Sequence, residues 1–153
     1  MNTLAGRLSA FINAEGHLTE LDINDDGTTA VRFRSRGLKY RAWTMSSDDA
    51  YLQLACAMTL EPDVIFDASL LRALLACQDR FKCVKFSLER EDTLLICAVE
   101  LFFAEPVGYQ STFWRSIGVI ETAAYAGLDV IRNHSTKLAA DKFIEELSQG
   151  TAL

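Results

Sequence analysis

The densest run of potential metal ligands in the sequence is DINDDG, residues 22–27. It fits the first half of the calcium-loop pattern D-x-[DN]-x-[DN]-G, in which closely spaced oxygens converge on one ion. That loop needs a bidentate glutamate at its twelfth position, and here the position is Phe33. A hairpin turn, with Asx side chains bonded to nearby backbone and Gly27 at positive φ, explains the same letters. We therefore predict a turn that binds no metal ion.

A second candidate is a cluster of cations followed by an aromatic residue. Its members are Arg32, Arg34, Arg36, Lys39 and Arg41, with Trp43 after them. Alternation along strands places most of these side chains on one face of a sheet. Positive charge beside an indole ring can receive an acidic peptide or single-stranded nucleic acid, through charge-assisted hydrogen bonds and stacking.

Two other interpretations of the same cluster need no ligand. Glu20 and Asp22 fall on the outward face of the preceding strand, where they can pair with the arginines. Charged side chains also keep exposed edge strands from pairing with other chains. We favour the ion pairs. We retain four possible partner-binding residues: Arg34, Arg41, Trp43 and, further along the chain, Trp114.

Catalytic chemistry finds no positive evidence in the sequence. A nucleophile needs a base within reach, and the histidines are His17 and His134, each expected in a connection and either exposed or capping. No serine lies in a G-x-S-x-G motif, and the eight scattered glycines form no phosphate-binding loop. We expect no enzymatic activity and no cofactor. The competing hypothesis is a small-molecule-binding protein or enzyme with a pocket between sheet and helices.

The four cysteines are expected to be buried free thiols. They are Cys56, Cys77, Cys83 and Cys97, which contain no C-x-x-C pair and sit in apolar segments. Metal and redox sites need closely spaced ligands. A disulfide between Cys77 and Cys83 is not expected in a reducing cytoplasm.

Length and charge restrict the class of protein further. A chain of 153 residues fits one domain. With 21 acidic and 15 basic residues the net charge is -6, which disfavours general binding to nucleic acid or anionic lipid. The N-terminus lacks the pattern of a signal peptide, and the most apolar run, residues 94–104, is shorter than a membrane span. We expect a cytoplasmic protein without a membrane partner.

Periodicity predicts the elements of the first half of the chain. Apolar residues at helical spacing between Leu4 and Ile12 predict a helix, with Thr3 as N-cap and Gly16 as its stop. Alternation then predicts strands over 18–23, 29–34 and 38–45, joined by tight turns. Residues 52–58 recur at period two and suggest a fourth strand, although this stretch is also compatible with a helix.

The second half of the chain predicts two helical regions around a hairpin. A helix is expected over 66–79, with Asp67 or Ser69 near its start, and its apolar face would hold Leu70, Leu71, Leu74 and Leu75. Strands over 84–89 and 93–103 follow. A helix from about Gln110 to Tyr125 or beyond then precedes a separate amphipathic segment that contains Leu138, Phe143, Ile144 and Leu147.

Strands grouped in runs predict an α+β fold, an antiparallel sheet with helices packed on it, in the order α-β-β-β(-β)-α-β-β-α(-α). With this order, the segments GLKYRAWTMSSDDAYLQLACAMTL, KCVKFSLEREDTLLICAVELFF and GYQSTFWRSIGVIETAAYAG resemble the YbjN-like family, from about residue 3 to 130. The family's fold is similar to that of type III secretion chaperones. The matching motifs are apolar patterns rather than catalytic signatures.

The resemblance implies a small acidic bacterial protein that binds or regulates another protein, a candidate sensory transduction regulator without established enzymatic activity. Secretion chaperones are acidic homodimers that hold unfolded stretches of their cargo in hydrophobic grooves. We therefore expect a non-catalytic, chaperone-like module that binds a protein or peptide and forms a homodimer.

Overall fold

The computed structural model describes residues 3–89, 93–105 and 108–150, the side chains of 146–150 excepted. Its elements, in chain order, are α1 (Leu4–Ala14), β1 (Thr19–Ile23), β2 (Thr28–Ser35), β3 (Leu38–Met45), β4 (Asp48–Thr59), α2 (Ala68–Gln78), β5 (Val84–Glu89), β6 (Leu94–Phe102), the 3-10 turn η1 (Gly108–Ser111) and α3 (Phe113–Gly150). The six strands form one antiparallel sheet in the order β1-β2-β3-β4-β6-β5. The α+β fold and the strand interpretation of residues 52–58 are confirmed.

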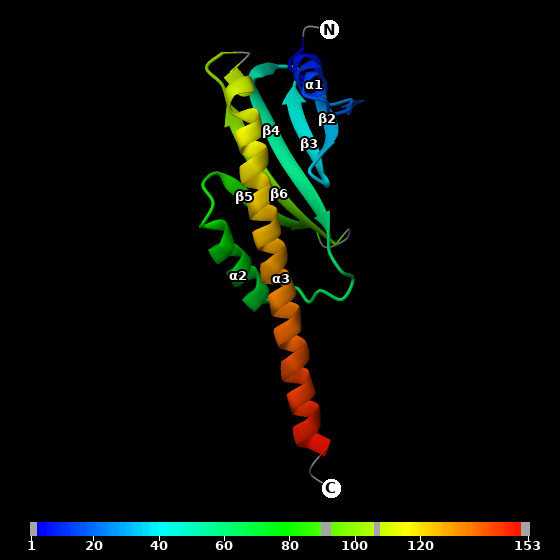
Figure 1. The fold of residues 1–153 in the computed structure, drawn as a ribbon, viewed down its shortest axis with the longest axis vertical. Helices are drawn as coiled ribbons and strands as arrows, with labels where there is room; N and C mark the ends of the chain where they lie inside the picture. The colour runs from blue at the N-terminus through cyan, green and yellow to red at the C-terminus, as the bar shows by residue number, and fades with distance from the viewer. Residues whose placement is uncertain (1–2, 90–92, 106–107, 151–153) are drawn as a thin grey trace.

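The helices cover one face of this sheet (Figure 1). α1 packs on β1, β2 and β3, whereas α3 packs on β4, β5 and β6 and also contacts α2. Leu52, Leu54 and Cys56 of β4 alternate toward the helices and are fully buried there. They meet the stripe of α3 that includes Phe113 and Ile117. The strand alternation therefore divides the sheet into a helix-covered face and an open face.

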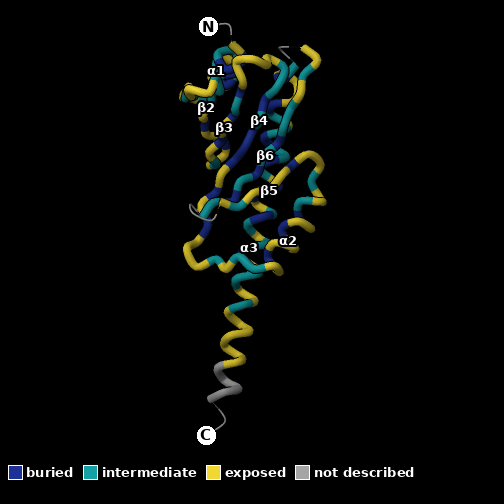
Figure 2. Tube along the Cα trace, turned by 180° about the vertical axis from the view of Figure 1, so that it is seen from behind, coloured by how far each residue is buried: buried dark blue, intermediate teal, exposed yellow. Residues whose placement is uncertain are grey.

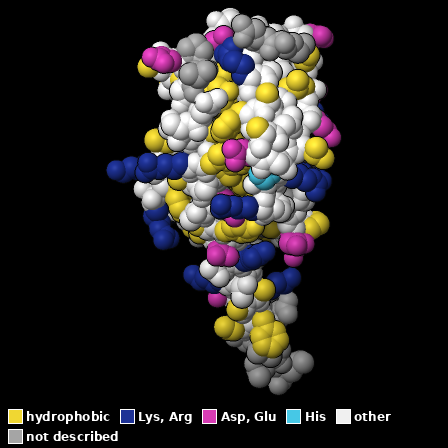
Figure 3. Space-filling view, turned by 45° about the horizontal axis from the view of Figure 1, so that its top comes forward, with side chains coloured by type: hydrophobic (Ala, Val, Ile, Leu, Met, Phe, Trp, Pro, Cys, Tyr) yellow, Lys and Arg dark blue, Asp and Glu magenta, His cyan; other side chains and the backbone are white. Residues whose placement is uncertain are grey.

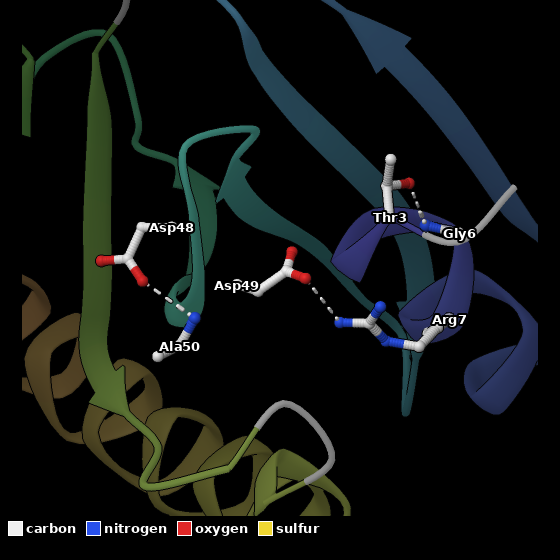
Figure 4. A network of polar contacts seen from close by, with 6 residues as sticks. All are labelled: Thr3, Gly6, Arg7, Asp48, Asp49 and Ala50. Carbon is white, nitrogen blue, oxygen red and sulfur yellow. Dashed lines mark hydrogen bonds and ion pairs between the residues drawn. The ribbon is translucent and has the colours of Figure 1, made fainter.

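Side-chain caps fix the starts of two helices. The Thr3 hydroxyl accepts a hydrogen bond from the Gly6 amide at 3.2 Å, and the Asp67 carboxylate accepts one from the Leu70 amide at 2.8 Å. Figure 4 shows the Thr3 cap beside the ion pair of Arg7 with Asp49, whose charged atoms lie 3.4 Å apart. Asp48 in turn accepts from the Ala50 amide. The ion pair of Arg7 with Asp49 therefore connects α1 to the start of β4.

The helix expected to run to Tyr125 or beyond does continue, and the expected connection at His134 is wrong, because α3 is one continuous helix of 38 residues. Gly127 lies inside this helix, at a point where the helix approaches the sheet closely. A Cβ added there would lie 2.9 Å from Leu95 Cδ2. His134 is consequently a helical residue rather than part of a connection. The last described buried residue of α3 is Ile131, and the helix continues past the lower edge of the sheet (Figure 1).

Candidate protein-binding face

The open face carries the side chain of every second residue in each strand. One row across the sheet runs from Glu20 of β1 through Arg32 and Arg41 to Ala55 of β4 and Ala98 of β6. The view from behind, in Figure 2, shows the strands of this face in front. The small side chains in its middle and the long ones of β3 make its surface uneven.

A hollow of about 1030 Å³ lies over this face. Ala55 and Ala57 of β4 lie along its middle, and Lys39, Arg41 and Trp43 of β3 line one side. Leu94 and Ile96 of β6 line the other side. The hollow also extends across the sheet, to Glu20, Arg32 and Arg34 beyond β3 and to Glu89 of β5 beyond β6. We call it the β4 trough.

The cations predicted to pair with acidic residues divide into two groups. Arg32 donates to Asp22, and Arg36 donates to Glu121 at 2.8 Å, so the predicted pairing is confirmed for Asp22. The Arg41 guanidinium instead lies over the Trp43 ring, 5.2 Å from its centroid. Lys39 and Arg34 are exposed, and within the described residues neither has a carboxylate at ion-pair distance.

The structure brings Arg34, Arg41 and Trp43 to one face but places Trp114 on the other. Trp114 belongs to α3 and packs in an aromatic cluster under the helix-covered face. Its ring neighbours are Phe11, His17, Phe33 and Phe113, at centroid distances of 5.0 to 6.4 Å. Trp114, which lies off the apolar stripe of Phe113, is thus covered within the monomer, because α1 and the residues before β1 pack against it.

Sequence reasoning missed the residues that shape the trough. Ala55 and Ala57 were not singled out, although their alternation with Leu54 and Cys56 marks them as outward. Phe102 is 76% exposed and lies 5.2 Å from Tyr51, ring to ring. Lys85 pairs with Glu100 at 2.8 Å, which raises the pKa of the lysine. The period-two pattern of β6 could have identified its own open-face residues, Glu100 and Phe102.

A second hollow, of about 350 Å³, lies where α2 meets β5 at the sheet edge. It is lined by Leu71, Leu74, Leu75, Gln78, Phe86 and Leu88. The expected inward face of α2 is only partly correct: Leu70 and Leu74 are buried, but Leu71 and Leu75 remain exposed beside this hollow. Its polar residue, Gln78, already accepts a hydrogen bond from the Phe86 amide at 2.7 Å.

The DINDDG run forms the predicted hairpin turn. Gly27 has φ of +82°, and the Asp26 carboxylate accepts hydrogen bonds from the Thr28 amide at 2.9 Å and from its hydroxyl at 2.6 Å. The hydroxyl bond is the main cause of the lowered pKa of Asp26. Among the described residues, no cluster of three or more His, Cys, Asp or Glu could hold a metal ion. Within the same residues, no helix has the length and apolar character to cross a membrane.

The two histidines have structural contacts. His17 Nδ1 lies 2.9 Å from the Arg34 carbonyl oxygen, and its ring stacks near Trp114. His134 is nearly buried, 10% exposed, and its Nε2 lies 3.3 Å from a carboxylate oxygen of Asp67, so it joins α3 to the start of α2. This position contradicts the expected exposed connection.

Comparison with known proteins supports the fold. An uncharacterized protein from Methanothermobacter thermautotrophicus superposes with a TM-score of 0.68, at 14% identity, over 86% of this chain and 98% of its own. YbjN from E. coli, titled a candidate transcription regulator, superposes with a TM-score of 0.56, at 15% identity, over 84% of this chain and 92% of its own. No family model and no curated protein matches the sequence. The resemblance to the YbjN fold is confirmed.

Proposed function

We propose that this protein is a non-catalytic binding module, chaperone-like or regulatory, that holds an extended segment of a partner protein in the β4 trough. The observation that carries the proposal is the trough itself. A sheet face left uncovered by the helices is hollowed by about 1030 Å³ and has Lys39, Arg41 and Trp43 along one side.

The shape of the trough favours an extended chain over a compact ligand. Its floor is made of strand residues, and a segment bound along β4 would place its alternate side chains over Ala55 and Ala57. The half-buried Trp43 offers the large, rigid apolar surface that is enriched at protein interfaces. A deep pocket with convergent polar groups, typical of small-molecule sites, is a different arrangement.

The state of the reactive side chains supports a non-catalytic role. Burial raises the pKa of Cys56 to about 11 and that of Cys97 to about 12, which disfavours the nucleophilic thiolate. Both histidines contact structural groups, as described above. The four free cysteines fit the reducing cytoplasm. A fold shared with YbjN is compatible with regulation by binding.

Affinity capture from the native lysate, followed by mass spectrometry, tests the proposal. Ala57→Trp fills the exposed floor of the trough, and Asn133→Trp adds the same ring at an exposed position of α3 as the matched control. We expect a protein captured by the wild type and by the control variant but lost with Ala57→Trp. Equal capture by all three folded proteins would contradict binding in the trough.

The hollow between α2 and β5 supports a second candidate function, the binding of a small apolar molecule. Its lining is mostly apolar surface at the sheet edge, and the side-chain oxygen of Gln78 already accepts a hydrogen bond from the Phe86 amide. Leu75 is 59% exposed there. Leu75→Glu should abolish binding of an apolar fluorescent probe if this hollow is the site, and unchanged probe binding would exclude it.

A further inference from the structure

We infer that the segment held in the β4 trough is acidic at alternate positions, with carboxylates that meet Lys39 and Arg41 and an apolar residue that meets Trp43. This inference rests on the proposed function and adds the chemistry of the partner. It follows from the spacing of three side chains on β3, from the lack of an ion pair at two of the cations within the described residues, and from a matching arrangement within the chain itself.

The spacing comes from the strand. Lys39, Arg41 and Trp43 are two residues apart and point to the same face, so they recur about every 6.6 Å along β3. An extended peptide has the same repeat for its alternate side chains. Two acidic residues separated by one position therefore match Lys39 and Arg41, and the next alternate residue lies against Trp43.

Glu20 and Glu89 also line the trough, but within the described residues neither forms an ion pair with Lys39 or Arg41. Lys39 has no carboxylate at ion-pair distance there, and Arg41 is held over the Trp43 ring. A guanidinium stacked on an aromatic face keeps its N–H edge available for hydrogen bonds to a carboxylate. Arg32, on the neighbouring strand, is already occupied by Asp22.

The chain contains its own example of the proposed recognition. β1 presents Glu20 and Asp22, two acidic residues one position apart, along the outer side of β2. Glu20 lies opposite Arg32 in the register, and Asp22 forms the ion pair with it. The cations of β3 repeat this pattern toward the trough, where the described chain supplies no acidic strand.

A protein of net charge -6 repels an acidic segment over long distances, so the attraction must be local. The same cations could also contact phosphates, and single-stranded nucleic acid is therefore the competing ligand. The small floor at Ala55 and Ala57 favours a peptide, because base stacking uses aromatic platforms and, of the aromatic residues that line the trough, Phe33 and Tyr40 are buried while Trp43 is half-buried.

The test uses the full chain and fluorescein-labelled nine-residue peptides, with affinity measured by anisotropy. In the first peptide Glu, Glu and Val occupy three successive alternate positions with Ser at every other position; in the second Gln replaces both Glu residues; in the third the two Glu residues are placed side by side and the composition is unchanged. A twelve-residue oligothymidine is the nucleic-acid probe. Lys39→Gln and Arg41→Gln remove the two cations, and Lys142→Gln removes an exposed cation of α3 as the control.

We expect the alternating Glu peptide to bind best, with about tenfold weaker binding for either cation variant and no change for Lys142→Gln. If the Gln peptide binds as tightly as the alternating Glu peptide, and Ala57→Trp blocks that binding, the acidic inference is overturned and the proposed function remains. No binding of any peptide, combined with unchanged protein capture by Ala57→Trp, would overturn both. If oligothymidine binds more tightly than every peptide, and Lys39→Gln and Arg41→Gln abolish that binding, the ligand of the trough is nucleic acid rather than a peptide.

Discussion

Cys56 and Cys97 lie opposite each other on β4 and β6, beneath the helices. Burial is the main cause of the raised pKa of both thiols, and it also raises that of Cys77. Cys83 differs: it is exposed, at a positive φ of 69°, just before β5 begins. The expectation that all four thiols are buried is therefore wrong for Cys83, because it lies in the connection between α2 and β5 rather than inside either element.

We predict that Cys83 is the thiol that reacts with a disulfide reagent in the native protein. Cys56, Cys77 and Cys97 should react only after unfolding, because they are buried and a raised pKa lowers the thiolate fraction. Absorbance after addition of the reagent at pH 8 measures the reaction, and Cys83→Ser should remove the native signal. Fast reaction of the Cys83→Ser protein would contradict the burial of the others.

At the scale of elements, α3 has two parts with different roles. Its first half packs on the sheet, and Phe113 is fully buried there. Its second half continues beyond Ile131 for about 20 Å at 1.5 Å per residue before the described side chains end. Phe143 in this second half is 61% exposed. The same residue type thus occurs in one helix in opposite environments.

We predict that Phe113→Ala lowers the free energy of unfolding by about 3–5 kcal/mol, because it empties a packed site. Phe143→Ala, in the same helix, should change the free energy of unfolding by less than about 0.5 kcal/mol when the protein is dilute enough to be monomeric. Urea unfolding followed by circular dichroism measures both. A loss for Phe143→Ala as large as that for Phe113→Ala would show that the end of α3 is packed in the folded protein.

The hairpin between β1 and β2 leads to another prediction, that calcium does not bind specifically to the DINDDG turn. The Asp26 carboxylate accepts a hydrogen bond from Thr28, and the Asp22 carboxylate accepts one from Arg32. Phe33 occupies the position at which the calcium loop needs a bidentate glutamate. Calorimetry at millimolar calcium should show no stoichiometric heat. A one-to-one transition that Asp26→Ala removes would contradict this.

At the scale of the whole molecule, exposed apolar side chains lie both on the body and at its projecting end. Leu71 and Leu75 are exposed on α2, and Phe143 is exposed on α3. In Figure 3 hydrophobic side chains are again visible at the narrow lower end of the molecule. Two copies related by a twofold axis could cover both surfaces at once, since each copy offers both.

We predict a homodimer that associates through apolar surface of the sheet or of the C-terminal helix and does not depend on disulfides. Sedimentation equilibrium at micromolar concentration should give about twice the chain mass of 17.0 kDa, unaffected by reductant. Phe143→Glu or Trp43→Glu should lower it and locate the face. Trp114 is unsuitable for this test because it packs beneath the helices. A mass of one chain would exclude the dimer.

The sequence by itself determined the elements whose signal is local. Alternation along β2, β3 and β4, the caps at Thr3 and Asp67 and the turn at Gly27 depend on residues within a few positions of each other. The order of these elements predicted the antiparallel sheet, and the resemblance of three segments to the YbjN-like family implied the fold. It also placed Arg34, Arg41 and Trp43 on one face of the sheet.

Tertiary structure alone decided what covers each face. Trp114 is partly buried because α1, distant in sequence, packs against it, and Gly127 lies inside a helix at a point where the sheet leaves no room for a Cβ. The β4 trough arises where Ala55 and Ala57 pair beside the long side chains of β3, a relation between strands that no local pattern contains. Whether a cation finds an acidic neighbour likewise depends on register, which joins Arg32 to Asp22 and leaves Lys39 facing the trough.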